Sequence, residues 1–191
     1  MLFKKLVELC KKKITVELWH DKDTTWLSNG EVYAKLGENT NFDFEDIICI
    51  MEVSDEKAES ITTTEAAFTE DDLHIFIPKS AEEIKMGRYS MNCDGLVLQP
   101  FETTKGILFL PAKHMQIFRD IGCKSYYLSK FRGGYIVLVA VDNNTIGMIR
   151  PHRTDLETMN LFSSGFDALV NMAYKNGFCD GGEHQYSLID E

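Results

Sequence analysis

Four side chains that can bind a metal ion lie close together near the C-terminus, in Cys179-Asp180-Gly-Gly-Glu183-His184. Thiolate, carboxylate and imidazole groups are the usual ligands of zinc. The Cys-x4-His spacing supplies only two of them, and the chain has no CxxC pair to complete a structural site. We therefore predict no cofactor and no metal site, with Cys179 and His184 as the weak candidates for one.

Cysteine is the second residue type that could do chemistry. The chain has five cysteines, an odd number without paired spacing, which indicates reduced thiols in a cytoplasmic protein. Cys93 lies in the predicted turn Asn92-Cys93-Asp94-Gly95 and could act as a nucleophile if a histidine lay beside it. A small metal- or cysteine-dependent hydrolase, built from Cys179, His184 or Cys93, is therefore the alternative function.

Charge is the most informative feature of the sequence. The 191 residues include 20 Lys and Arg against 30 Asp and Glu, which gives a net charge of −10. Residues 37–83 hold 14 acids and two bases, whereas residues 84–153 hold ten bases and four acids. Such separation of charge gives a protein a strong electrostatic field on one face, which favours an interaction with a charged partner. Because the sequence also has no recognisable catalytic motif, we favour an interaction protein over an enzyme.

Each charged block suggests a different partner. The acidic block could occupy a basic groove of a partner protein, where its carboxylates would mimic the phosphates of DNA; its candidate residues are Glu45, Asp46, Asp55, Glu56, Asp71 and Asp72. The basic block could bind nucleic acid through Lys113, Arg119, Lys124, Lys130 and Arg132. Alternatively, the two blocks neutralise each other within the molecule. We predict a non-enzymatic protein and favour a protein partner over nucleic acid.

The elements that must position these residues are both helices and strands. Apolar periodicity and capping residues predict helices over 2–13, 41–51, 55–60, 80–86, 112–121 and 154–175. Alternation and β-branched residues predict strands over 14–19, 61–68, 73–77, 95–99, 106–110, 125–131, 134–141 and 145–150, with a hairpin at Asn29-Gly30. The expected fold is α+β, a mainly antiparallel sheet or sheets with four to five helices packed on one or both faces.

We expect a single domain over residues 1–177, with a possible division near 72–79, followed by an acidic, mobile tail over 178–191. No stretch approaches the roughly 18–20 apolar residues of a membrane span, so no membrane association is expected. The order of strand 106–110, helix 112–121 and strands 125–131, 134–141 and 145–150 resembles the unit repeated in DNA sliding clamps. That resemblance implies a clamp-like basic side facing DNA.

Overall fold

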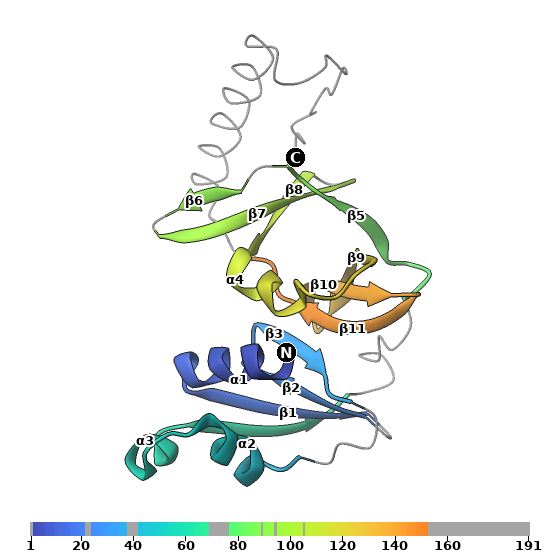
Figure 1. Cartoon of the computed structure of the whole chain (residues 1–191). Coiled ribbons are helices and arrows are strands. Elements are labelled where there is room, and N and C mark those ends of the chain that lie inside the picture. The colour runs from blue at the N-terminus through green and yellow to red at the C-terminus, as the bar shows by residue number, and fades with distance from the viewer. Residues whose placement is uncertain are drawn as a thin grey trace. The chain divides into compact units, whose positions relative to one another are not determined.

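The structure is a computed structural model of the whole chain, shown in Figure 1. It describes residues 2–21, 24–37, 42–68, 77–88, 90–93, 95–104 and 106–152. The chain divides into two compact units, residues 1–151 and residues 152–191, and the fold below is that of the first unit. The predicted helix 154–175 and tail 178–191 lie outside the described residues, as do residues 73–76 of the predicted strand 73–77.

The predicted α+β fold, with four to five helices packed on the faces of the sheet, is wrong, because the described part of the chain is mostly β-sheet. Strands hold 49% of its residues and helices 24%. The helices are α1 (Leu2–Lys13), α2 (Phe44–Met51), α3 (Asp55–Glu59) and α4 (Ala112–Met115), and a 3-10 turn, η1 (Gln116–Phe118), follows α4. Three of the four helices are therefore two turns or shorter.

Eleven strands form one sheet in the described residues, in the order β4-β1-β2-β3-β11-β10-β9-β5-β7-β6, with β8 paired to β7. All of these pairings are antiparallel except that of β1 with β4. The strands are β1 (Thr15–Asp21), β2 (Thr24–Ser28), β3 (Val32–Lys35), β4 (Thr62–Ala67), β5 (Glu82–Met86), β6 (Met91–Cys93), β7 (Leu96–Thr103), β8 (Gly106–Pro111), β9 (Lys124–Phe131), β10 (Gly134–Val141) and β11 (Asn144–Ile149).

Strand β5 overturns the predicted helix over 80–86. The Ser80-Ala-Glu-Glu83 sequence matches a helix capping box, but the backbone here is extended. Glu82 to Ile84 pair with β9, and Lys85 and Met86 pair with β7, so one short strand joins two parts of the sheet. Ile84 is buried in the core at 3% exposure. Hydrogen bonds to two strands together with this burial outweigh the local preference for a helix.

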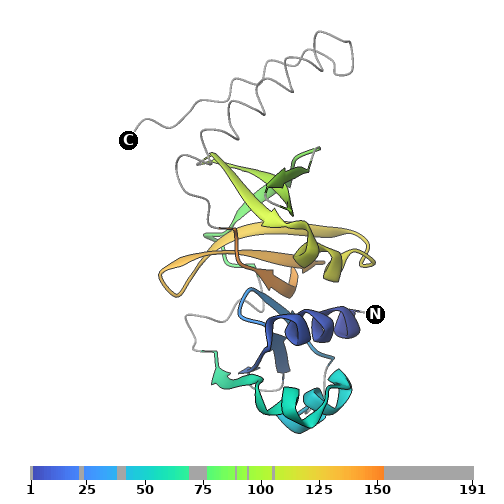
Figure 2. The same ribbon diagram turned by 90° about the vertical axis from the view of Figure 1, so that its left-hand side faces the viewer.

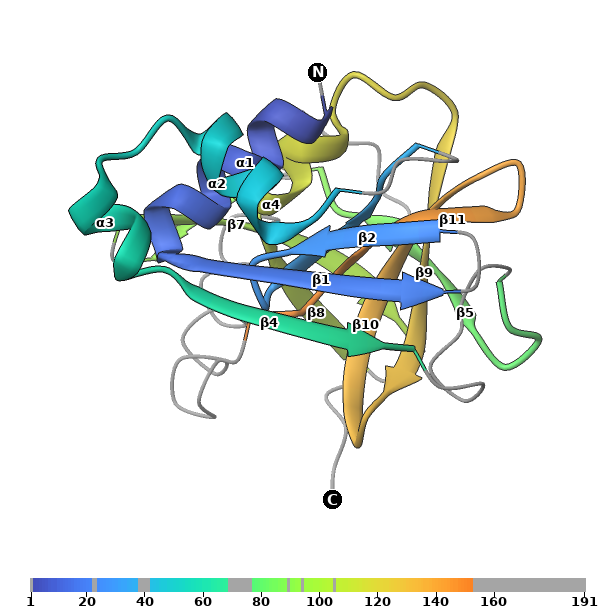
Figure 3. The same cartoon turned by 90° about the horizontal axis from the view of Figure 1, so that it is seen from below.

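The sheet is buried on both faces at its centre, and the helices of the described residues cover one of them. Leu6 and Cys10 of α1, Ile47 of α2 and Phe118 of η1 belong to a core that also contains one face of the central strands. We call this the helix-bearing face. The opposite face carries a separate aromatic cluster around Trp19, which contains no helix residue in the described part. Figure 3 shows α1 and α2 side by side over the strands.

Strand β10 contributes to both cores. Val137 and Val139 lie in the helix-bearing core, whereas Ile136 and Leu138 lie in the aromatic cluster. This explains the long apolar run of that strand, which is typical of strands buried on both faces. The predicted helix over 112–121 is shorter than expected, because α4 changes to the 3-10 turn η1 at Gln116. The strand–helix–three-strand order is present as β8, α4, β9, β10 and β11.

Candidate interaction surface

Four of the predicted acidic binding residues lie in the first turns of two neighbouring helices. Glu45 and Asp46 begin α2, and Asp55 and Glu56 begin α3. Helix N-termini favour negative side chains because the backbone dipole is positive there. Asp43 caps α2 by accepting from Asp46 N at 2.9 Å, and the Asp46 side chain accepts from Asp43 N in return. All four side chains are exposed. Asp71 and Asp72 lie outside the described residues.

These carboxylates belong to a larger exposed group that continues into strand β4. Figures 1 and 2 show α2 and α3 side by side at the end of the sheet that carries β4. Between residues 44 and 67 the single base is Lys57. We call the exposed carboxylates of this segment the acidic surface; its members are Glu45, Asp46, Glu52, Asp55, Glu56, Glu59 and Glu65.

The predicted basic residues come from several elements of the described chain. Lys113 lies on α4, Arg119 follows η1, and Lys124 begins β9. Lys130 and Arg132 lie at the other end of β9 and in the turn after it. A strand rises about 3.3 Å per residue, so Lys124 and Lys130 begin about 20 Å apart. Lys124 and Lys130 are an even number of residues apart and therefore lie on the same face of β9, and the clamp-like basic side stays a prediction.

The structure also bears on whether the two charged blocks neutralise each other. The ion pairs among described residues include Lys5–Asp120 at 2.8 Å and Lys13–Glu31 at 3.0 Å, together with two histidine–glutamate pairs that are ionic when the imidazole is protonated, His20–Glu65 at 3.0 Å and His114–Glu31 at 3.2 Å. None of these four joins a carboxylate of residues 37–83 to a lysine or arginine of residues 84–153. Of these pairs, only His20–Glu65 involves the acidic surface.

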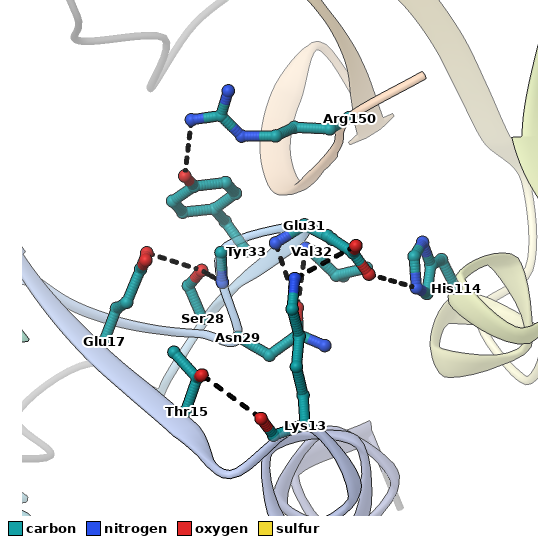
Figure 4. A network of polar contacts seen from close by, with 11 residues as sticks. Lys13, Thr15, Glu17, Ser28, Asn29, Glu31, Val32, Tyr33, His114 and Arg150 are labelled. Carbon is teal, nitrogen blue, oxygen red and sulfur yellow. Dashed lines mark hydrogen bonds and ion pairs between the residues drawn. The ribbon is translucent and has the colours of Figure 1, made fainter. Parts of the chain in front are cut away.

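A separate polar network gathers around Glu31, as Figure 4 shows. One carboxylate oxygen of Glu31 pairs with Lys13 at the end of α1, and the other lies 3.2 Å from Nε2 of His114 on α4. Burial tends to raise the pKa of Glu31, but the hydrogen bond from Lys13 and the charges of Lys13, His114 and Lys113 outweigh it and lower the pKa. The network therefore ties the β2–β3 hairpin to two helices. Its members are far apart in the sequence, and no motif indicates it.

The predicted hairpin at Asn29-Gly30 is confirmed, although its turn lies one residue later than expected. Asn29 N donates to Val32 O at 3.3 Å, which makes Gly30 and Glu31 the central residues. Of these two only Gly30 has a positive φ, 83°, as a type II′ turn requires at its first central position. Asn29 Oδ1 accepts from the backbone N of Glu31 and of Val32 and so holds the turn. This is why the Glu31 side chain is available at the tip of the hairpin.

Two arginines flank the aromatic cluster on the other face of the sheet. The Arg132 guanidinium lies 4.3 Å from the centroid of the Trp19 ring, a cation–π contact. Arg150 donates to the Tyr33 hydroxyl at 3.1 Å. Burial raises the pKa of Tyr33, and the hydrogen bond from Arg150 only partly offsets that rise. The indole nitrogen of Trp19 donates to Glu17, 3.0 Å away. These contacts pair the Tyr33 hydroxyl and the indole nitrogen of Trp19.

The candidate chemical groups are not brought together in the described part of the chain. Cys93 is half-buried in β6, and Cys49 and Cys123 are exposed. Burial raises the pKa of the Cys10 thiol to about 12, which leaves it unreactive. No group of three or more His, Cys, Asp and Glu that could hold a metal occurs in the described ranges. Cys179 and His184 lie outside them, so the hydrolase alternative stays a prediction.

No protein-family model matches the chain, and neither a curated protein nor a solved structure matches it. The resemblance to DNA sliding clamps therefore finds no support among solved structures. Within the described residues, no helix is long and apolar enough to cross a membrane.

Proposed function

We propose that the chain is a non-enzymatic protein-interaction module whose acidic surface binds a basic segment of a partner protein. One observation carries the proposal: the carboxylates of α2, α3 and β4 are all exposed, and they lie along one continuous segment at one end of the sheet. A surface of one sign raises the association rate of a partner of opposite charge and excludes partners of like charge. The scattered positions of the predicted basic residues favour this choice over binding of nucleic acid.

The proposal includes a cytoplasmic location. The four cysteines in the described residues, Cys10, Cys49, Cys93 and Cys123, are all free thiols. Free thiols, two of them exposed, are typical of proteins kept in a reducing compartment. A basic groove that normally holds DNA is one surface such a module could occupy, and in that case added DNA should compete for the partner.

The test is binding of a fluorescent lysine-rich peptide, measured by anisotropy at low salt and at about 0.3 M salt. The triple variant Glu45→Gln/Glu56→Gln/Glu59→Gln removes three charges from the acidic surface without touching the Asp43–Asp46 cap. The control Glu83→Gln/Glu102→Gln/Asp142→Asn removes three charges from other exposed positions. We expect salt-sensitive binding that the first variant weakens and the control retains. Equal weakening in both variants would mean that net charge alone drives binding, and the proposal would be wrong.

A further inference from the structure

The outer edge of strand β4 offers backbone hydrogen-bonding groups that point away from the sheet. Thr62 N donates to Ile14 O at 3.1 Å, and Phe68 N donates to His20 O at 3.0 Å. In a strand, the N–H and C=O of alternate residues point to the same side. The backbone groups of residues 62, 64, 66 and 68 therefore face β1, and those of Thr63, Glu65 and Ala67 face outward. Within the described residues, β4 pairs with β1 alone.

Within the described residues, Glu65 is the one device on this edge that hinders pairing with another strand. Natural edge strands are often blocked by charged side chains, proline, a bulge or very short length, or are covered by a helix or loop. Strand β4 reads Thr-Thr-Thr-Glu-Ala-Ala, and its register with β1 runs unbroken from Thr15–Thr62 to His20–Ala67. The side chains of residues 62–65 are exposed. Figure 3 shows β4 beside β1, on the side away from β2.

The charges around this edge determine which kind of segment could pair with β4. Glu65 is in register with Leu18, whose side chain lies in the helix-bearing core, so Glu65 points to the same face of the sheet as α2. A second copy of the chain paired along β4 would bring two acidic surfaces together, and like charges across such a contact are unfavourable. An extended basic segment would instead place its positive side chains beside Glu65 and the acids of α2 and α3.

We propose that the outer edge of β4 takes an extended, basic segment of a partner protein as an additional strand. The inference rests on the proposed function, because the acidic surface supplies the selection for positive charge. Main-chain hydrogen bonds to residues 63, 65 and 67 supply the affinity, as in other cases of strand addition. Side chains alternate between the two faces of a strand, so every second residue of the bound segment faces the acids. The preferred segment alternates lysine or arginine with small or β-branched residues.

The test compares three peptides on the unaltered protein. The first is a decapeptide of alternating lysine and valine; the second has the same sequence with N-methyl groups on the backbone nitrogens of alternate residues along one edge. Both carry the same charge, but the second cannot donate hydrogen bonds from that edge. A further methylated peptide covers the other edge, since either edge could pair. We expect one of the two methylated peptides to bind about tenfold more weakly or worse, from the loss of two or three hydrogen bonds.

Amide exchange gives a readout at single residues. In the free protein the amides of Thr62, Thr64 and Ala66 should exchange slowly, because they face β1, and those of Thr63, Glu65 and Ala67 should exchange fast. The unmethylated peptide should slow exchange at the latter three. Equal affinity of all the peptides, with no change in exchange at these residues, would overturn strand addition while leaving the acidic surface as a binding site. Absence of salt-sensitive binding by any peptide would overturn both proposals.

A variant of the protein supplies the converse experiment. Thr63→Pro/Ala67→Pro removes two outward N–H groups, and proline is tolerated on the open side of an edge strand. The matched control Thr63→Ser/Ala67→Ser changes the same positions but retains the N–H groups. We expect the proline variant alone to lose peptide binding. Since these prolines could also disturb folding, circular dichroism of both variants accompanies the measurement, and the methylated peptides test the inference on the unaltered chain.

Discussion

Oε2 of Glu31, at the tip of the β2–β3 hairpin, lies 3.2 Å from Nε2 of His114 on α4. His114 is only 2% exposed, whereas the Glu31 side chain is 39% exposed. The same carboxylate pairs with Lys13, so this contact joins the hairpin to α1 and α4 at once. The charge of the Glu31 carboxylate therefore makes the stability of the fold depend on pH.

The pH dependence follows from the lowered pKa of Glu31. A carboxyl group whose pKa is lower in the folded state stabilises the protein above its ordinary pKa of 4.5, and this contribution is lost as the pH falls through the folded value. Because Glu31 is partly exposed, we expect Glu31→Gln to cost no more than about 1 kcal/mol at neutral pH. The difference from the parent should vanish in acid. Urea unfolding across the pH range measures it, with Glu102→Gln as the control; a difference that persisted in acid would contradict the assignment.

Ile14 connects α1 to β1 with a φ of 56°, a conformation that a β-branched residue rarely adopts. The left-handed region costs an L-residue about 1–2 kcal/mol, and glycine avoids most of that cost. Ile14 is also 38% exposed, so its removal loses less apolar burial than the removal of a core residue would, and this loss offsets part of the gain. We expect Ile14→Gly to stabilise the protein by up to about 1 kcal/mol, seen as a higher Tm. Ile14→Val, which keeps the branching, should bring no gain; a Tm for Ile14→Gly below that of the parent would refute the argument.

Gly147 of β11 has no room for a side chain. A Cβ there would overlap the Phe118 ring and lie 3.1 Å from Tyr33 O, and Phe118 is fully buried. We expect Gly147→Ala to destabilise the protein by about 1–3 kcal/mol, because the core would have to shift. Gly122→Ala is the matched control, since nothing lies within 4 Å of a Cβ at that position. Chemical denaturation compares the two variants, and similar losses in both would show that the core is looser than described.

The cysteines should differ in reactivity. The Cys10 thiol is fully buried, donates to Ser28 O at 3.5 Å and has a pKa of about 12, so almost none of it is thiolate near neutral pH. Cys49 and Cys123 are exposed. Brief treatment with iodoacetamide at about pH 8 should therefore alkylate Cys49 and Cys123 but leave Cys10 unmodified. Peptide mass spectrometry reads the sites, and the denatured protein serves as the control. Rapid alkylation of native Cys10 would disprove its burial.

Several elements could be predicted from the sequence because their causes are local. The strands predicted over 125–131, 134–141 and 145–150 imply turns between them. The structure forms these turns at Arg132-Gly133 and Asp142-Asn143, where both central residues have the positive φ that a two-residue hairpin needs. The apolar stripe of α1 and the acidic first turn of α2 likewise depend on residues that are close together in the sequence. The exposure of Glu45, Asp46, Asp55 and Glu56 follows from the same local patterns.

The tertiary structure decided what depends on residues distant in the chain. Ser80 to Glu83 carries a helix-capping pattern. Pairing with β9 and β7 nevertheless makes Glu82–Met86 a strand. The sequence indicated a strand near 61–68 but not that, among the described strands, it would lie at the end of the sheet and pair with β1 alone. No pattern in the sequence indicates that Glu31 lies beside His114 either. Strand order and long-range contacts arise from burial summed over many residues, and that sum exceeds any preference a short sequence expresses by itself.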